Sequence, residues 1–376
     1  MAGQPEKKEK VLKTYCRKTV IDRDFISSGY ESWVKAPAGK KNLWRVAEEY
    51  GSADALIDEI TSEIETRSLS FRPFKRYLRK EKGKNGKNRK ISIACVKYQV
   101  VTYAFRNATA DMMHAKVGYY QSAGIRGRGQ KHVRKALRKW SAEGNAYHVK
   151  GDVRKCYEHI TCGLVMRMLT KFVANEDVLY MARALLSCFT FGVLEIGTYF
   201  ALLMANLVLS FAYHFIEGLH KVRRGERKRL VRHQIWHLDD LLLIGNDKRD
   251  LKRAMRKLAR YMGCFLGLEL KSWKVAATGD VERLDMGGFV ARGGIVTLRS
   301  HLFLSSKRAF ARFDKKRTST LASRCCSYWG WLKHSDSREF CKNNNVFGLL
   351  KSARKLKSRA SKRKAAACIA QSAQLL

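Results

Sequence analysis

Two adjacent acids, Asp239 and Asp240, interrupt the apolar run "QIWHLDDLLLIG" at residues 234–245. An unpaired carboxylate is expensive to bury, so acids in such a run need a partner, a metal ion or a place in a turn. The simplest interpretation is a two-residue turn between strands with both acids in water, because Asp is common in turns. Whether these acids do chemistry depends on the rest of the chain.

A third acid, Asp152, ends a strand predicted from Tyr147 to Val149 in "AYHVKGDVRKCYEHI". In a small sheet this strand end can lie beside the turn that carries the other two acids. Three converging carboxylates repel one another unless divalent cations neutralise them. With two Mg²⁺ ions they would stabilise the attacking and leaving oxygens of a phosphoryl transfer. The spacing therefore predicts a two-metal site.

The charge of the chain is strongly one-sided, with 75 Lys and Arg against 33 Asp and Glu and a formal net charge of +42. Such an excess repels itself unless a polyanion neutralises it, and nucleic acid is the usual one. An anionic membrane surface is the competing partner. The 376 residues, with 45% hydrophobic residues and 3 Pro, indicate a folded, helix-rich protein of two or three domains.

The ten cysteines show no C-x-x-C pair, which argues against a zinc ribbon and a secreted disulfide framework. The first 13 residues lack the apolar segment of a signal peptide. We therefore expect a cytoplasmic protein with reduced thiols. Residues 196–213 carry no charge and approach the length of a membrane span. Asn206 within them, and Glu195 just before, favour a buried core helix, so we expect no membrane partner.

The hydrophobic patterns predict an α+β protein. Helices are expected in residues 1–70, followed by a basic hairpin whose second strand covers 91–96. The strand ending at Asp152, a buried helix, the hairpin around Asp239 and a helix at 248–262 then follow in the order of a split βαβ sheet. Two short strands joined at Gly293–Gly294 precede a basic helical C-terminal region.

The segment "GIRGRGQKHVRKALRKW" predicts a helix with an apolar stripe on one face and cations on another. Backbone N–H groups at a helix start and a row of cations suit a phosphate backbone, although a solvated basic face would look the same. The predicted nucleic-acid contacts are Arg126, Arg128, Lys131, Lys135 and Arg138.

Together these motifs resemble the reverse transcriptases. "HLDDLLLIG" resembles their x-x-DD box, with His237 where Tyr is usual, and "DVRKCY" resembles their first catalytic box. On that match Tyr157 would be the steric gate that crowds a ribose 2′-hydroxyl and so selects dNTPs. "RKISIACVKYQVVTYAF" looks like the fingers motif, which would place Arg89 on the incoming triphosphate, helped by Lys82 or Lys84.

The resemblance extends from about residue 70 to 340. "LDMGGFVARGGIVTLR" is similar to a primer-grip hairpin, and "SYWGWLKHSD" to a thumb sequence. With "GRGQ", the thumb stretch is most like diversity-generating retroelement enzymes and defence-associated bacterial reverse transcriptases. The resemblance implies a right-hand polymerase with a split-βαβ palm. We expect an N-terminal helical extension at 1–70, interleaved fingers and palm at 71–300, and a basic helical thumb and tail at 301–376.

One box departs from the family pattern. "IGTYFALLMANLVLS" aligns with a box that ordinarily reads I-G-x-x-x-S-Q and then A-N, and the Gly197 and Asn206 anchors are present. Ala201 replaces the Ser, and Leu202 replaces the Gln that packs against the nascent base pair. Leu keeps the bulk of Gln but loses its amide hydrogen bonds. We infer unusual nucleotide selection or a specialised template.

The leading hypothesis is an RNA-directed DNA polymerase that uses two Mg²⁺ ions and serves a specific non-coding RNA in phage defence. The resemblance implies metal ligands Asp152, Val153, Asp239 and Asp240, catalysis by the three acids, and a dNTP site that includes Leu202. Template RNA and a cDNA product would be its partners, with an accessory protein, a second subunit or a homo-oligomer left open. The alternatives are a diversity-generating retroelement enzyme, an RNA-binding scaffold with a polymerase fold, and a membrane-surface protein.

Overall fold

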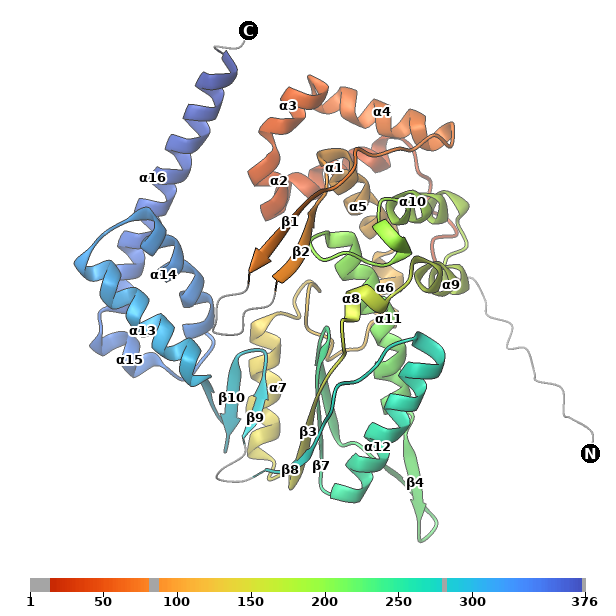
Figure 1. Cartoon of the computed structure of the whole chain (residues 1–376), viewed down its shortest axis with the longest axis vertical. Helices are drawn as coiled ribbons and strands as arrows, with labels where there is room; N and C mark the ends of the chain where they lie inside the picture. Colours follow the sequence, from red (N-terminus) through yellow and green to blue (C-terminus); the bar gives the residue numbers. More distant parts are fainter. Residues whose placement is uncertain (1–13, 81–87, 279–282, 374–376) are drawn as a thin grey trace, which may run out of the picture. The chain divides into compact units, whose positions relative to one another are not determined.

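The computed structural model describes residues 14–80, 88–278 and 283–373, with side chains described as far as residue 361 (Figure 1). The chain divides into two compact units, each assembled from three segments. The first unit consists of Met1–Gly124, Asp152–Leu219 and Ala254–Ser272. The second consists of Ile125–Gly151, His220–Arg253 and Trp273–Leu376.

Helices dominate the first unit. Several begin at side-chain caps that the sequence supplies: Asp22, Ser52 and Thr198 each accept a hydrogen bond from a backbone N–H in the first turn. Helix α1 packs closely on α5 at Gly29, where a Cβ would lie 2.8 Å from Ala104 Cβ. The helices are α1 (Arg23–Lys35), α2 (Pro37–Asn42), α3 (Trp44–Tyr50), α4 (Ala53–Glu65), α5 (Val96–Ala108), α6 (Ala110–Lys116), α8 (Cys156–His159), α9 (Cys162–Phe172), α10 (Glu176–Ser187), η1 (Thr190–Gly192) and α11 (Tyr199–Glu217).

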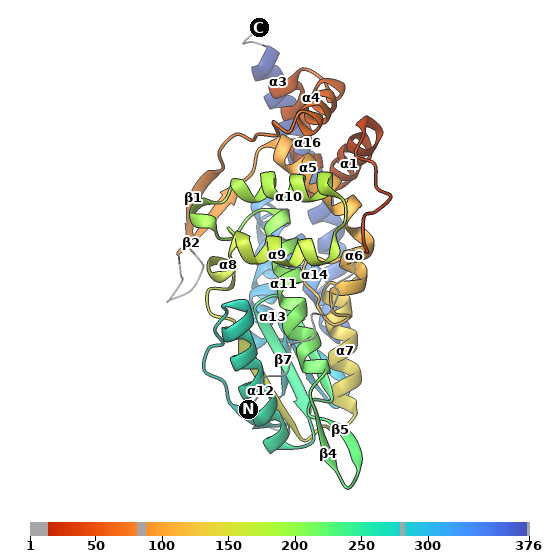
Figure 2. The ribbon, with the colours of Figure 1, turned by 90° about the vertical axis from the view of Figure 1, so that its right-hand side faces the viewer.

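Helix α11 forms the core of this unit and contacts α5, α6, α8 and α9. Figure 2 shows α9 and α10 lying next to each other beside it. In the described part of the chain, α11 is the one helix long and apolar enough to cross a membrane, and 72% of that apolar window is buried inside the protein. Burial against neighbouring helices explains the uncharged run that the sequence shows.

A two-stranded antiparallel hairpin, β1 (Lys75–Lys80) and β2 (Asn88–Ile93), completes the first unit and confirms the predicted basic hairpin. The strand predicted at 91–96 was placed too far along the chain. β2 ends at Ile93, and Val96 begins α5, because Val96, Val100 and Val101 are buried at helical spacing.

The second unit contains a four-stranded sheet in the order β6-β7-β3-β8. β6 and β7 form a tight antiparallel hairpin, and β3 pairs antiparallel with β8. Four consecutive residues of β7, 241–244, are fully buried, as expected for a strand covered on both faces. The strands are β3 (Tyr147–Asp152), β6 (His233–His237), β7 (Asp240–Gly245) and β8 (Val275–Ala277).

The rest of the second unit packs around helix α7 (Gln130–Ala142), whose Val133, Leu137 and Trp140 are buried as predicted. A second sheet, ordered β11-β10-β9, lies against α7. A helical region follows, in which Trp331 packs on Phe289 and on the bare backbone of Gly288. These elements are β9 (Leu284–Met286), β10 (Phe289–Arg292), β11 (Ile295–Leu298), α13 (Ser300–Lys315), α14 (Ser319–Leu332), α15 (Arg338–Asn343) and α16 (Val346–Ala373).

A short hairpin and one long helix remain. β4 (His220–Arg223) and β5 (Glu226–Arg229) belong to the second unit and turn at Arg224–Gly225, both with positive φ. Helix α12 (Lys248–Tyr261) ends in a π-helical turn, η2 (Met262–Leu266). Leu251, Met255 and Leu258 of α12 are buried, as its periodicity predicts.

We predict that Gly197→Ala destabilises the protein by at least about 2 kcal/mol, measured by urea unfolding. Gly197 has φ +124°, and a Cβ there would lie 2.2 Å from the carbonyl oxygen of Ser92. Gly218→Ala is the matched control, because its nearest neighbouring atom would lie at 3.5 Å and its φ is −76°. Equal stability of the two variants would contradict the prediction.

Candidate active site

The turn between β6 and β7 carries two of the predicted acids. His237 pairs with Asp240 across the hairpin, so Leu238 and Asp239 form the two-residue connection. Leu238 has φ +55°, a left-handed conformation that is a genuine outlier for a bulky residue. Such strain amounts to about 1–3 kcal/mol and persists where surrounding structure enforces it, often at functional sites. Both carboxylates are half-buried.

The strands below the turn hold it in place. Ile235 and Trp236 of β6 are fully buried, and Trp236 Nε1 donates a hydrogen bond of 2.9 Å to Gln234 Oε1. Burial lowers the pKa of the His237 imidazole, although the nearby Asp240 charge acts in the opposite direction. The turn is therefore a polar tip on an apolar, well-packed support.

Asp152 is the last residue of β3, the strand next to β7 in the sheet. The residue before it, Gly151, lies against Leu241, the residue after Asp240. A Cβ on Gly151 would be 3.0 Å from Leu241 Cγ, which is closer than most side chains approach. Glycine therefore lets the two strands pack at their site ends without a collision.

Within the first unit, Asp152 contacts a segment that sequence reasoning missed. Lys271 Nζ lies 2.5 Å from Asp152 Oδ1, and the Lys271 backbone N–H donates to the Asp152 carbonyl at 2.8 Å. Val153 and Leu270 form an antiparallel bridge between the same two segments. The ammonium lies at ion-pair distance, yet Oδ1 is buried without a well-directed hydrogen bond. Lys271 thus supplies a positive charge to this carboxylate.

The donors present suit a hard cation such as Mg²⁺, which prefers carboxylate and carbonyl oxygens. Asp152 Oδ1 is a buried acceptor with unused hydrogen-bonding capacity. In this conformation, no three His, Cys, Asp or Glu side chains of the described residues gather into a metal cluster. A cation bound at Asp152 Oδ1 would compete with the Lys271 ammonium for that oxygen.

The residues predicted to contact a nucleotide are distributed over the first unit. Arg89 lies exposed on β2, opposite Arg79. Tyr157 is half-buried in the short helix α8. Lys82 and Lys84 lie outside the described residues.

Leu202, on α11, lies against Gly124, where a Cβ would come within 2.3 Å of Leu202 Cδ2. Asn206, one turn further along α11, fixes the same loop. Its Nδ2 donates to the backbone carbonyls of Ala123 and Leu202 at 2.9 Å each, and Gln121 Nε2 donates to the backbone carbonyl of Asn206. The loop before Arg126 is therefore bound to α11 beside the position where the family carries Gln.

Glu195 is a second residue that sequence reasoning missed. Arg76 of β1 binds its carboxylate with two hydrogen bonds of 2.9 Å, and Thr190 donates through both its N–H and its hydroxyl at 2.7 Å. Ser92 of β2 donates a further hydrogen bond. Burial raises the pKa of Glu195, but the hydrogen bonds from Arg76, Ser92 and Thr190 outweigh burial and lower it to about 2. This carboxylate clamps the β1–β2 hairpin to the segment that leads into α11.

The predicted nucleic-acid contacts on and before α7 differ in their surroundings. Lys131 and Lys135 are exposed, as is Arg126, whereas Arg128 is half-buried. Arg138 lies 3.8 Å from Asp336, which also binds Arg134 at 3.1 Å. Asp336 therefore partly neutralises the positive charge of Arg138.

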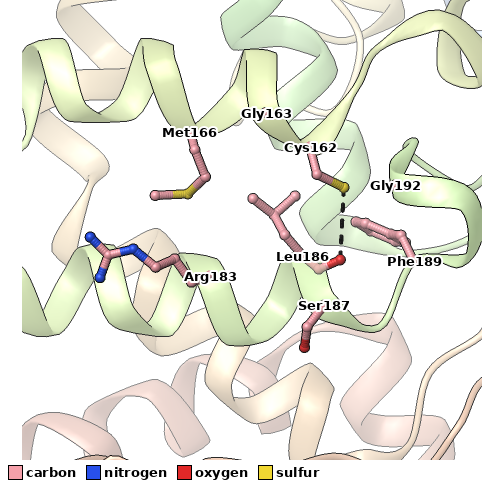
Figure 3. A pocket seen from close by; sticks show the side chains of 8 residues that line it. All are labelled: Cys162, Gly163, Met166, Arg183, Leu186, Ser187, Phe189 and Gly192. Carbon is pink, nitrogen blue, oxygen red and sulfur yellow. Dashed lines mark hydrogen bonds between the residues drawn. The ribbon is translucent and has the colours of Figure 1, made fainter.

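A small pocket of about 340 Å³ lies between α9 and α10 in the first unit (Figure 3). The Cys162 thiol points to the carbonyl of Leu186 at 3.8 Å, and burial raises its pKa, so this thiol is not activated. None of the predicted site residues lines the pocket. Its lining consists of Cys162, Gly163, Met166, Arg183, Leu186, Ser187, Phe189 and Gly192.

Comparison with known proteins identifies one family. Residues 78–291 match the family described as reverse transcriptase (RNA-dependent DNA polymerase). Among solved structures, the chain is similar to an apo telomerase from Candida tropicalis truncated from its C-terminal domain, with 10% identity and a TM-score of 0.41. That alignment covers 65% of this chain and 60% of the telomerase chain. No curated protein matches the chain significantly.

We predict that Glu195→Gln lowers the unfolding free energy at pH 7 by roughly 2–3 kcal/mol. The folded pKa of about 2 lies below the ordinary value of 4.5, so this stabilisation is present above pH 4.5 and is lost as pH falls towards 2. Urea unfolding measured at several pH values should show a flatter acid limb for the variant. Glu176→Gln, at an exposed ion pair, is the control and should change little.

Proposed function

This chain belongs to the reverse transcriptase family of RNA-directed DNA polymerases, and we propose that its active site is the β6–β7 turn together with the end of β3. The observation that carries this proposal is the sheet order, in which β3 is the neighbour of β7. The acids at the adjoining ends of those strands are Asp152 and Asp240, with Asp239 in the turn.

In this proposal Asp152, Asp239 and Asp240, with Val153, hold two Mg²⁺ ions. When bound, the ions stabilise the attacking 3′-oxygen, the leaving pyrophosphate and the charge that develops between them. The protein residues supply position: the buried β7 strand and the left-handed Leu238 fix the tip. The Lys271 ammonium neutralises Asp152 in this structure and would compete with a bound cation for its Oδ1.

The incoming nucleotide is held by residues of the first unit. Arg89 binds the triphosphate, since a guanidinium presents a planar set of donors to phosphate oxygens. Lys82 or Lys84 assists it. Tyr157 crowds the ribose 2′-hydroxyl and selects dNTPs. Leu202 contacts the nascent base pair through its apolar side chain alone, which cannot make the hydrogen bonds of the family's usual Gln.

We further propose that the enzyme serves a specific non-coding RNA in phage defence, in the cytoplasm, with Lys131, Lys135, Arg126, Arg128 and Arg138 contacting its RNA. The altered Ala201–Leu202 box supports this role, because a dedicated template places low demands on general copying. The thumb sequence and "GRGQ" favour the alternative, a diversity-generating enzyme with an accessory protein. Sequencing nucleic acid that copurifies with the protein separates the two: a defined non-coding RNA with a short repetitive product supports defence, and copies of a variable repeat support diversification.

We predict that Asp239→Asn reduces dNTP incorporation by roughly 10²–10³-fold or more, because a charge-stabilising group is removed from the transition state. RNA affinity, measured by filter binding, should stay within about twofold. Asp24→Asn on α1 is the control, since its carboxylate is exposed and lies far along the chain from the site. Full incorporation by Asp239→Asn would remove Asp239 from the catalytic site, whereas absence of incorporation by the wild-type protein would favour the non-enzymatic alternative, an RNA-binding scaffold.

We also predict that Tyr157→Ala relaxes sugar discrimination by roughly 10- to 100-fold, because removing the ring opens space for a 2′-hydroxyl. Competing incorporation of rNTPs and dNTPs by the same enzyme preparation measures the ratio. Tyr119→Ala serves as the control, because this side chain is 60% exposed. Unchanged discrimination in Tyr157→Ala would remove Tyr157 from the nucleotide site.

A further inference from the structure

Three aromatic rings lie in a row at the end of α12, the first pair stacked and the second tilted. The rings of Phe215, on α11, and Tyr261 lie 4.2 Å apart and 10° from parallel, and Tyr261 and Phe265 follow at 5.1 Å and 32°. All three belong to the first unit. Phe265 is 68% exposed, so the stack ends in a ring with an open face. Isolated exposed aromatics are common, but a stacked row that ends in solvent is a ready platform for another flat ring.

The backbone presents Phe265 through an unusual turn. Residues Met262–Leu266 form a π-helix, a rare geometry that frequently occurs at functional sites. Met262 and Leu266 are buried and anchor the turn, while Phe265 points away from the core that they join. Gly267, with φ +65°, ends the helix. The exposed Phe265 ring is therefore carried by a regular helical turn with two buried anchor residues.

Cations lie directly before the stack. Arg256, Lys257 and Arg260 are exposed on α12, and within the described residues no acid lies within ion-pair distance of them. Arg256 and Arg260 are one turn apart, about 6 Å along the helix. Like charges at this spacing repel each other, and a bound polyanion would relieve that repulsion. The three cations could contact the phosphates of a strand whose base lies on the Phe265 ring.

We propose that this surface, formed by Arg256, Lys257, Arg260 and the exposed face of Phe265, binds a single-stranded segment of RNA outside the copying site. Exposed aromatic rings beside a row of cations are how proteins hold single strands, because every base has a face to stack. Bases in a duplex are already stacked and cannot use the platform. The choice of RNA rests on the proposed function, which gives the protein an RNA partner.

A membrane surface is the other polyanion that a basic helix could meet. An amphipathic helix enters a membrane interface through its apolar face. Here that face is occupied by the protein core, since Leu258 and Met262 are fully buried. The apolar group left at this surface is Phe265, which favours a stacked base over a lipid interface.

The test uses the full chain already loaded with a short blunt primer–template hybrid, so that the copying site is occupied. Fluorescence anisotropy then measures binding of a labelled oligo(rU) strand. Phe265→Ala should weaken binding roughly five- to hundredfold, and Phe265→Trp should retain it. The double variant Arg256→Gln/Arg260→Gln should lower the slope of log affinity against log salt by about 1.4, because each phosphate contact on a single strand contributes about 0.7. Trp44→Ala and Lys40→Gln/Lys41→Gln, at other exposed positions, are the matched controls.

Primer extension on the same hybrid lengthened by a template overhang, with dNTPs added, separates this proposal from the proposed function. Every variant should extend the hybrid at the wild-type rate, because none of the changed residues belongs to the proposed active site. Absence of extension by the wild-type protein would reject the polymerase assignment and leave the oligo(rU) result standing. Unchanged oligo(rU) affinity in Phe265→Ala would overturn the platform, as would binding of oligo(dT) or anionic vesicles without oligo(rU).

Discussion

Four consecutive buried side chains, Leu241 to Ile244, hold β7 inside its sheet, between β6 and β3. A slip of one residue would exchange the faces on which they pack and draw Asp240 into the buried run, so this packing holds the register of the hairpin. The register in turn determines which residues form the turn, and it places a bulky Leu at the position of left-handed backbone. The polar tip, with its two acids, is therefore set by apolar packing several residues away.

Much of this arrangement could be predicted from the sequence, because it rests on local patterns. The hairpin at Asp239, the strand that ends at Asp152 and the amphipathic helices α7 and α12 follow from hydrophobic periodicity. The start of α5 was misplaced because "ISIACV" is apolar and β-branched, whereas its last residues contribute to a helix that continues as "KYQVVTYAF". The position of a boundary inside an apolar run depends on tertiary packing, which no local pattern contains.

The contacts that could not be predicted are those between distant polar residues. Lys271 is one of 75 basic residues, and nothing in "GLELKSW" marks it as the partner of a carboxylate more than a hundred residues earlier. Glu195 shows the same limit: its partners come from two strands and a turn. Its position inside an apolar stretch was the available signal, since a buried acid requires compensating donors. That signal indicates that partners exist, but it does not identify them.

Leu238 has a consequence for how this protein can change. Glycine or asparagine would adopt the left-handed backbone with little strain, so relief of that strain alone would raise the free energy of unfolding. A small residue would also leave the tip freer to move, because it would remove the half-buried Leu238 side chain from the turn. At this position, therefore, a change that raises the stability of the fold also lowers the rigidity of the turn. In a library of variants selected for thermal tolerance alone, we expect residues other than leucine to be enriched at position 238.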